Sequence, residues 1–107
     1  MGWSVEFLDS DAKAEVDQLS VDLRAKFERI VTLIKLKGLE QVREPYVKHL
    51  DGKLWEIRMI GKDTIARSIY VTAPGRRIVV LHTFIKKTDK TPSGALNVAR
   101  RRAKEVG

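Results

Sequence analysis

Three strand-like segments that follow one another with only short turns between them constrain this chain most. They span residues 54–60, 65–72 and 77–85, and the turns at 61–63 and 73–76 contain glycine. Neighbouring strands joined by turns of this length pair antiparallel. The sequence therefore predicts an antiparallel meander as the centre of the fold.

The residues before the meander predict one more strand and two helices. Residues 3–8 alternate between polar and apolar, and residues 9–11 offer N-cap side chains for a short helix. Ser20 is a second cap, and apolar residues recur after it at helical spacing until Gly38. We expect a helical hairpin, followed at residues 38–53 by a connector that ends in an Asp-Gly turn.

A last helix is predicted after the meander. Thr91 is its expected N-cap and Pro92 its first residue, and one side of residues 93–106 is apolar while the rest is basic. The expected fold is α+β: an antiparallel sheet with the N-terminal helical hairpin and the C-terminal helix packed on one of its faces. A length of 107 residues suits one domain with a modest core, here residues 1–107.

The charge of the chain is concentrated in its second half. Residues 1–52 hold 8 Lys and Arg against 10 Asp and Glu, whereas residues 53–107 hold 13 against 4. A basic half indicates nucleic acid or another polyanion as a partner, and a solvated face is the alternative. Without cysteine, disulfides and cysteine-based zinc sites are excluded. No apolar run approaches the roughly 18 residues of a membrane span, and we expect a cytoplasmic protein without membrane contact.

Charged side chains occupy strand positions that are normally apolar. Alternation places Glu56 and Arg58 on one face of their strand, and Arg67 stands among Ile and Val on the next. If the strands are adjacent, Arg58 and Arg67 lie side by side, at a cost unless an anion or a carboxylate meets them. Glu56 is one such partner. A phosphate held by the arginines, with Lys86 and Lys87 nearby, is the other.

His82 has two interpretations. Alternation places it on the same face as Ile78, Val80 and Phe84, as a packed core residue or as an acid–base group. No metal-binding motif is present, so no metal or other cofactor is expected.

Four segments together resemble the RelE/HigB toxins of type II toxin–antitoxin modules, and most closely the phage-derived HigB-like branch. They are Leu54–Arg58, Arg67–Tyr70, His82–Pro92 and Ala99–Arg102. The resemblance spans essentially the whole chain. It implies a RelE-like fold and a metal-independent endonuclease that cleaves mRNA in the ribosomal A site. It also implies a cognate antitoxin, often a helix-turn-helix protein, that inhibits the toxin by binding it.

The resemblance also implies roles for individual residues. Arg67 matches a central-strand arginine that contacts the phosphate or the transition state, and Arg58 and Lys87 match further basic positions. Lys86 and Lys90 are expected to hold the RNA backbone. The basic last helix adds two expected RNA contacts, Arg100 and Arg101.

Two questions stay open at this stage. Some relatives carry a tyrosine in the C-terminal segment, but the last tyrosine here is Tyr70. The general base is therefore His82, Glu56 or a lysine of lowered pKa. ParE-type relatives share the fold and inhibit gyrase, so a gyrase inhibitor and a non-catalytic RNA-binding module are the alternatives to a nuclease.

Overall fold

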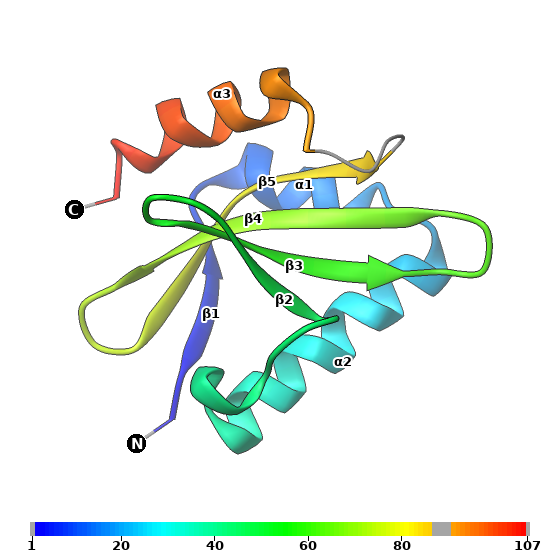
Figure 1. Cartoon of the computed structure of the whole chain (residues 1–107), viewed down its shortest axis with the longest axis horizontal. Coiled ribbons are helices and arrows are strands. Elements are labelled where there is room, and N and C mark those ends of the chain that lie inside the picture. Colours follow the sequence, from blue (N-terminus) through cyan, green and yellow to red (C-terminus); the bar gives the residue numbers. More distant parts are fainter. Residues whose placement is uncertain (1, 87–90, 107) are drawn as a thin grey trace.

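A computed structural model describes residues 2–86 and 91–106 of the chain (Figure 1). Five strands, three α-helices and one short 3₁₀-helix (η1) follow one another in these residues. In chain order they are β1 (Ser4–Phe7), α1 (Ser10–Asp17), α2 (Val21–Lys37), η1 (Leu39–Gln41), β2 (Val47–Asp51), β3 (Leu54–Ile60), β4 (Ile65–Ala73), β5 (Arg77–Lys86) and α3 (Ser93–Ala103).

The predicted meander forms the centre of the sheet. The strand order is β1-β5-β4-β3-β2, and β3, β4 and β5 pair antiparallel as neighbours. The turn from β4 to β5 is built on Gly75 and Arg76, both with a positive φ angle. Glycine adopts this conformation without a steric cost, which explains its place in the turn. The prediction of the meander is confirmed to within one residue at each strand end.

The helical hairpin begins and ends where its caps predict. The Asp9 side chain accepts a hydrogen bond from the backbone N–H of Ala12, and α1 follows. Ser20 caps α2 through the N–H of Leu23, and Gly38, at a φ of 88°, ends that helix. Short polar side chains at the N-cap satisfy backbone donors that the helix leaves without partners.

The expected connector was wrong for residues 47–51, which form β2. This edge strand pairs antiparallel with β3 through Val47 and Ile57, and the turn between them contains Gly52. Backbone pairing with β3 stabilises a segment whose own composition is weak for a strand. The Asp-Gly turn is a known hairpin signal, and it was the one indication of this strand in the sequence.

The sheet is mixed rather than wholly antiparallel. β1 lies at the edge opposite β2 and runs parallel to β5, with Val5 opposite Ile78. The helical hairpin carries the chain from β1 across the sheet to the far edge, so β1 is left to pair with the last strand. Strand direction depends on where the chain enters the sheet, and hydrophobic periodicity does not encode this.

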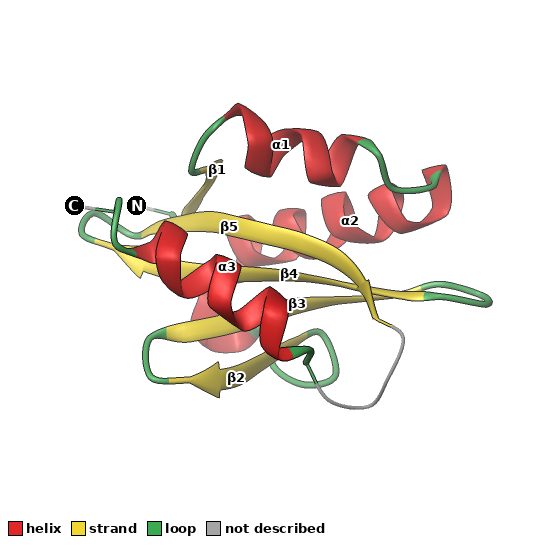
Figure 2. Cartoon of the chain, turned by 90° about the horizontal axis from the view of Figure 1, so that it is seen from above, coloured by secondary structure: helices red, strands yellow, loops and turns green. Residues whose placement is uncertain are grey.

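Helices cover both faces of the sheet, not one. Figures 1 and 2 show α2 on one side of the strands and α3 on the other. Phe27 and Ile30 of α2 belong to the core cluster that contains Tyr70, while Ala99 of α3 packs with the cluster around Ile69. Since successive residues of β4 point to opposite faces and nearly all of them are buried, each face has a cover, and α3 supplies the second.

A β-bulge in β5 changes which residues share a face. Ile69 lies opposite His82 and Tyr70 opposite Val80, so Leu81 is an extra residue. Strict alternation predicted that His82 and Phe84 share the face of Val80. Because of the extra residue, they do not. A bulge inserts one residue and re-aims those beyond it. Here it places Phe84 directly opposite Arg67.

Candidate functional site: a buried carboxylate among four cations

A carboxylate and two guanidinium groups meet on the α3 face of β3 and β4. Arg58 and Arg67 are direct cross-strand partners, and Glu56 is two residues along β3 from Arg58. Arg67 Nη1 lies 3.2 Å from one Glu56 oxygen, and Arg58 Nε lies 3.9 Å from the other. The local pairing that the sequence left open is therefore present, and so is the clustering of arginines.

Two lysines from the flanking strands add to the positive charge around Glu56. Lys48 of β2 lies opposite Glu56, and Lys86 of β5 lies opposite Ile65. Both act on the Glu56 carboxyl electrostatically, together with Arg58 and Arg67. Four strands thus bring four cations around one carboxylate, a group we call the Glu56 cluster. Its formal charge is positive, as an anion-binding surface requires.

Burial differs sharply within the Glu56 cluster. Glu56 is 0% exposed and Arg67 is 3% exposed, while the Arg58 side chain is 19% exposed. Burial raises the pKa of Glu56, because desolvation of the carboxylate outweighs the attraction of Arg67, Arg58, Lys48 and Lys86. The fully buried Glu56 forms ion pairs with both arginines, and Arg58 is the arginine nearer to solvent.

Thr91 does not cap α3 but contacts Arg67. Its hydroxyl accepts a hydrogen bond of 2.8 Å from Arg67 Nη1. The helix begins at Ser93 with Pro92 in the cap position and without a side-chain cap bond. The predicted cap was wrong because a buried guanidinium on β4 takes the same hydroxyl, a contact between residues distant in sequence.

His82 belongs to a second group, beside the Glu56 cluster. Its Nδ1 lies 2.9 Å from Glu15 Oε1 of α1, and its ring stacks on Phe84 at 5.6 Å. The same Glu15 oxygen accepts bonds from the Thr83 backbone N–H and from Arg102 Nη1. Glu15 thus accepts a backbone hydrogen bond from the part of β5 that extends beyond its pairing with β1. Neither Glu15 nor Arg102 stands out in the sequence as a site residue, because their meeting depends on the packing of α1 and α3.

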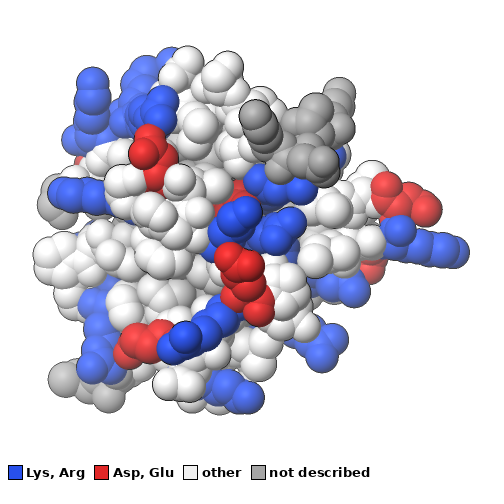
Figure 3. Space-filling view, viewed as in Figure 1, with Lys and Arg blue, Asp and Glu red and all other residues white. Residues whose placement is uncertain are grey.

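The remaining predicted site residues lie apart. Arg100 pairs with Asp51 at the end of β2 through an exposed ion pair, and Arg101 is exposed on α3. Lys87 and Lys90 lie outside the described residues. Figure 3 shows Lys and Arg side chains gathered near the middle of the viewed face, below α3, with acidic side chains among them.

Residues 2–86 and 91–106 contain no group of three His, Cys, Asp or Glu side chains that could hold a metal ion. Over the same ranges, none of the helices has the length and apolar character needed to cross a membrane.

The five-stranded mixed sheet, with a helical hairpin on one face and α3 on the other, is a small RelE-like α+β fold. The chain belongs to the family described as Phage derived protein Gp49-like (DUF891), whose family model matches residues 14–104. This phage-derived family is toxin-like and related to RelE and HigB. A search of curated proteins found no match to the chain.

Proposed function

We propose that this chain, as a single domain over residues 1–107, is the toxin of a type II toxin–antitoxin module of the HigB-like branch. It acts as a metal-independent endoribonuclease that cleaves mRNA in the ribosomal A site and so blocks translation. The observation that carries the proposal is the Glu56 cluster, in which Lys48, Arg58, Arg67 and Lys86 surround one buried carboxylate. Membership of a toxin-like family supports it independently.

The reaction that suits this cluster uses the RNA itself as the nucleophile. The ribose 2′-oxygen attacks the adjacent phosphorus, and the bond from phosphorus to the 5′-oxygen breaks. The 2′-hydroxyl loses a proton and the 5′-oxygen gains one, which leaves a 2′,3′-cyclic phosphate and a 5′-hydroxyl. Negative charge grows on the phosphate oxygens during this step. Cations placed in advance stabilise that charge more than they stabilise the substrate.

The exposures suggest how the cluster divides this work. Arg58, with a 19% exposed side chain, and the half-buried Lys86 are the groups nearest to a substrate phosphate. Arg67 lies beneath them and contacts Thr91 and Glu56. We assign Glu56 as a positioning residue, because its buried carboxylate is already engaged by Arg67 and Arg58 beneath the solvent-facing cations. Lys87 stays a proposed phosphate contact from the resemblance alone.

The proton of the 2′-hydroxyl has no clear acceptor among the described residues. Glu56 is covered, and His82 is bound to Glu15 and stacked on Phe84. A lysine of the cluster or the ribosome itself is left for this role. Such an incomplete site agrees with an enzyme that needs the ribosome to shape its substrate.

Two kinds of partner follow from the proposal. A cognate helix-turn-helix antitoxin binds the toxin and inhibits it, and mRNA is the substrate. Lys90, Arg100 and Arg101 are proposed contacts to the RNA backbone. Because Arg100 is paired with Asp51, its contact requires exchange of an exposed ion pair, which costs little.

Mapping of mRNA 5′ ends after brief expression tests the proposal. We expect new ends in phase with codons for the wild type, and a loss of at least tenfold in their frequency for Arg58→Ala and Arg67→Lys. Arg67→Lys keeps the buried charge but removes the planar fork, and circular dichroism checks that each variant folds. Arg24→Ala on the exposed face of α2 is the charge-matched control and keeps full cleavage.

Other outcomes reject the nuclease. DNA damage without new mRNA ends identifies a ParE-like gyrase inhibitor. RNA binding without cleavage identifies a non-catalytic binding module. Full activity in both arginine variants shows that the Glu56 cluster is not the site.

The role of Glu56 has its own test. Glu56→Gln keeps the shape and an acceptor oxygen but cannot take a proton. For a positioning residue, cleavage by Glu56→Gln falls by less than about tenfold, and the shape of its pH–rate profile matches the wild type. Loss of one limb of that profile identifies Glu56 as the general base instead.

A further inference from the structure

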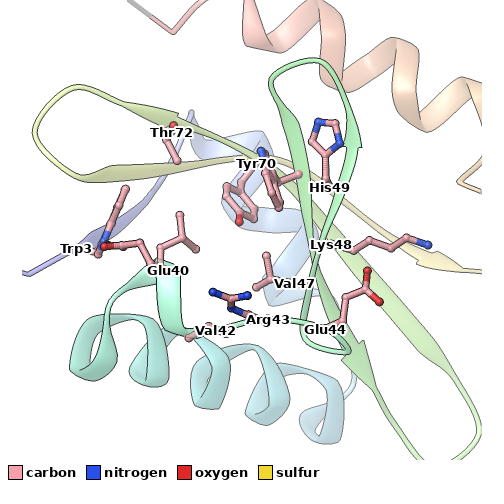
Figure 4. Close-up of a pocket in the computed structure, with 12 residues that line it drawn as sticks. Trp3, Glu40, Val42, Arg43, Glu44, Val47, Lys48, His49, Tyr70 and Thr72 are labelled. Atoms are coloured by element: carbon pink, nitrogen blue, oxygen red, sulfur yellow. Dashed lines mark hydrogen bonds between the residues drawn. The ribbon is translucent and has the colours of Figure 1, made fainter.

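A cavity of 540 Å³ lies on the opposite face of the sheet from the Glu56 cluster. Strands β2, β3 and β4 form its floor, and η1 with the segment that follows forms one wall (Figure 4). Its lining includes Trp3, Trp55 and Tyr70. The volume falls within the range of about 300–1,000 Å³ that is usual for small-molecule sites.

One polar group in this cavity lacks a partner. Tyr70 is 1% exposed, and no group among residues 2–86 and 91–106 forms a hydrogen bond with its hydroxyl. Figure 4 shows the Tyr70 ring extending from β4 with its hydroxyl directed into the cavity. A buried hydroxyl without a partner costs free energy, and an acceptor on a ligand that enters the cavity would remove this cost. Burial also raises the pKa of Tyr70, which keeps the hydroxyl a donor.

Flat aromatic surfaces flank this hydroxyl. Trp55 is 39% exposed, although it is a large apolar residue, and the His49 ring packs edge-on against it at 4.8 Å. On the other side, the indole N–H of Trp3 is held by Glu40 at 2.9 Å. Two indoles that are accessible from one cavity suit a planar ring, because stacking needs a fixed aromatic face.

Positive charge lies at the same opening. Figure 4 shows the Arg43 guanidinium directed from the chain after η1 towards the space below the Tyr70 hydroxyl. Lys48 of β2 borders the cavity through its backbone, and its side chain extends away from the cavity (Figure 4). The Glu40 carboxylate is engaged by Trp3, and its backbone hydrogen bond and this indole contact lower its pKa. The Arg43 guanidinium, with its planar fork of donors, favours a ligand that carries phosphate.

We propose that this cavity is a nucleotide-binding site. The base lies between the aromatic walls and accepts a hydrogen bond from the Tyr70 hydroxyl, and the phosphate contacts Arg43. The ligand is a free nucleotide or one nucleotide of an RNA strand. The site does not rest on the proposed nuclease activity, because none of the side chains that contact the nucleotide belongs to the Glu56 cluster.

The chain carries its own reporter for this site, because its only two tryptophans both line the cavity. The folded protein is titrated with the four nucleoside 5′-monophosphates and with the matching nucleosides, and tryptophan fluorescence is followed. We expect saturable quenching by at least one nucleotide. If a short RNA competes with this nucleotide, the site binds a nucleotide that is part of an RNA strand. A nucleotide that binds while RNA does not compete identifies a free ligand.

Variants that remove single groups make the test specific. Tyr70→Phe deletes only the hydroxyl and is expected to weaken nucleotide binding about fivefold to tenfold. Arg43→Gln is expected to weaken the nucleotide by about tenfold but to leave the nucleoside unchanged. Tyr46→Phe is the matched control, because Tyr46 is 46% exposed and lies outside the cavity lining.

Three results overturn the proposal. The first is the absence of saturable quenching by every nucleotide, and the second is an equal nucleotide affinity of the wild type and Tyr70→Phe. The third is a saturable change in tryptophan fluorescence that only aromatic peptides produce. The last result reassigns the cavity to a protein partner. None of these results bears on mRNA cleavage, which is measured separately.

Discussion

Arg58 and Arg67 lie directly opposite each other on β3 and β4, on the same face of the sheet. Two like charges in this position repel each other and destabilise a strand pair. The Glu56 carboxylate contacts both, at 3.9 Å from Arg58 and 3.2 Å from Arg67, and so makes the arrangement tolerable. The cluster still carries an excess of positive charge, which we relate to the binding of phosphate.

The raised pKa of Glu56 predicts a pH-dependent effect of Glu56→Gln on stability. The folded-state pKa lies above the unfolded value of about 4.3, so the native state binds the proton more tightly. The contribution of protonated Glu56 to the free energy of unfolding is fully present below the unfolded-state pKa. It is lost as the pH rises through the folded-state pKa. Glutamine cannot ionise. The variant should therefore gain stability over the wild type across this window, with a constant difference above it.

Urea denaturation at a series of pH values measures this difference. Glu28→Gln, on the exposed face of α2, serves as the control and should show no such trend. A Glu56→Gln variant that becomes less stable than the wild type with rising pH would show that the ion pairs outweigh burial.

The two arginines of the Glu56 cluster should differ in their contribution to stability. Arg67→Ala removes the closer counterion of a buried carboxylate, and we expect a loss of about 3–5 kcal/mol. Arg58→Ala removes a more distant and partly exposed partner, with an expected loss of about 1 kcal/mol or less. The loss from Arg67→Ala should shrink in a Glu56→Gln background, because no buried charge is then left alone. A double-mutant cycle by chemical denaturation gives this coupling, and strict additivity would contradict it.

Arg102 of α3 forms hydrogen bonds with α1 and β5, and its removal should lower the stability of the protein. Its Nη1 donates to the Leu81 carbonyl at 2.7 Å and to both Glu15 oxygens at 3.1 Å. We expect Arg102→Ala to lower the free energy of unfolding by about 2–3 kcal/mol. Arg101→Ala changes the same residue type one position earlier in α3, where the side chain is exposed, and should cost less than about 0.5 kcal/mol. Equal effects of the two variants would show that the Glu15 contacts do not hold α3.

Removal of the Tyr70 hydroxyl is expected not to destabilise the ligand-free protein, which is uncommon for a change in a buried side chain. Because it has no partner among the described residues, Tyr70→Phe should leave the ligand-free protein as stable as before or raise its stability by about 1 kcal/mol. Thermal unfolding of the variant and of Tyr46→Phe makes the comparison. A loss of more than about 1 kcal/mol would mean that the hydroxyl is already satisfied in the free protein.

Much of the fold followed from local signals. The caps at Asp9 and Ser20, the glycine at 38 and the turns of the meander each act within a few residues, and each prediction was confirmed. Predictions that depended on distant partners were less successful. Thr91 satisfies Arg67 instead of α3, and residues 47–51 become a strand because β3 is available to pair with them.

The pairing of Glu56 with arginines was open in the sequence for a similar reason. Alternation placed Glu56, Arg58 and Arg67 on faces that could meet, and the β3–β4 register brought them together. Alternation failed at His82, because the bulge at Leu81 shifts the phase of β5. A bulge leaves little trace in composition, since the residue it inserts is an ordinary apolar one.

The amino-acid sequence by itself determined the helices, the meander and the presence of arginines where apolar residues belong, because caps, turns and periodicity are short-range effects. The tertiary structure alone decided that α3 covers the second face and that Glu15 binds His82 and Arg102. It also decided that Tyr70 presents an unsatisfied hydroxyl to a cavity. These features arise where residues far apart in the chain come into contact, and short-range patterns in the sequence do not encode such contacts.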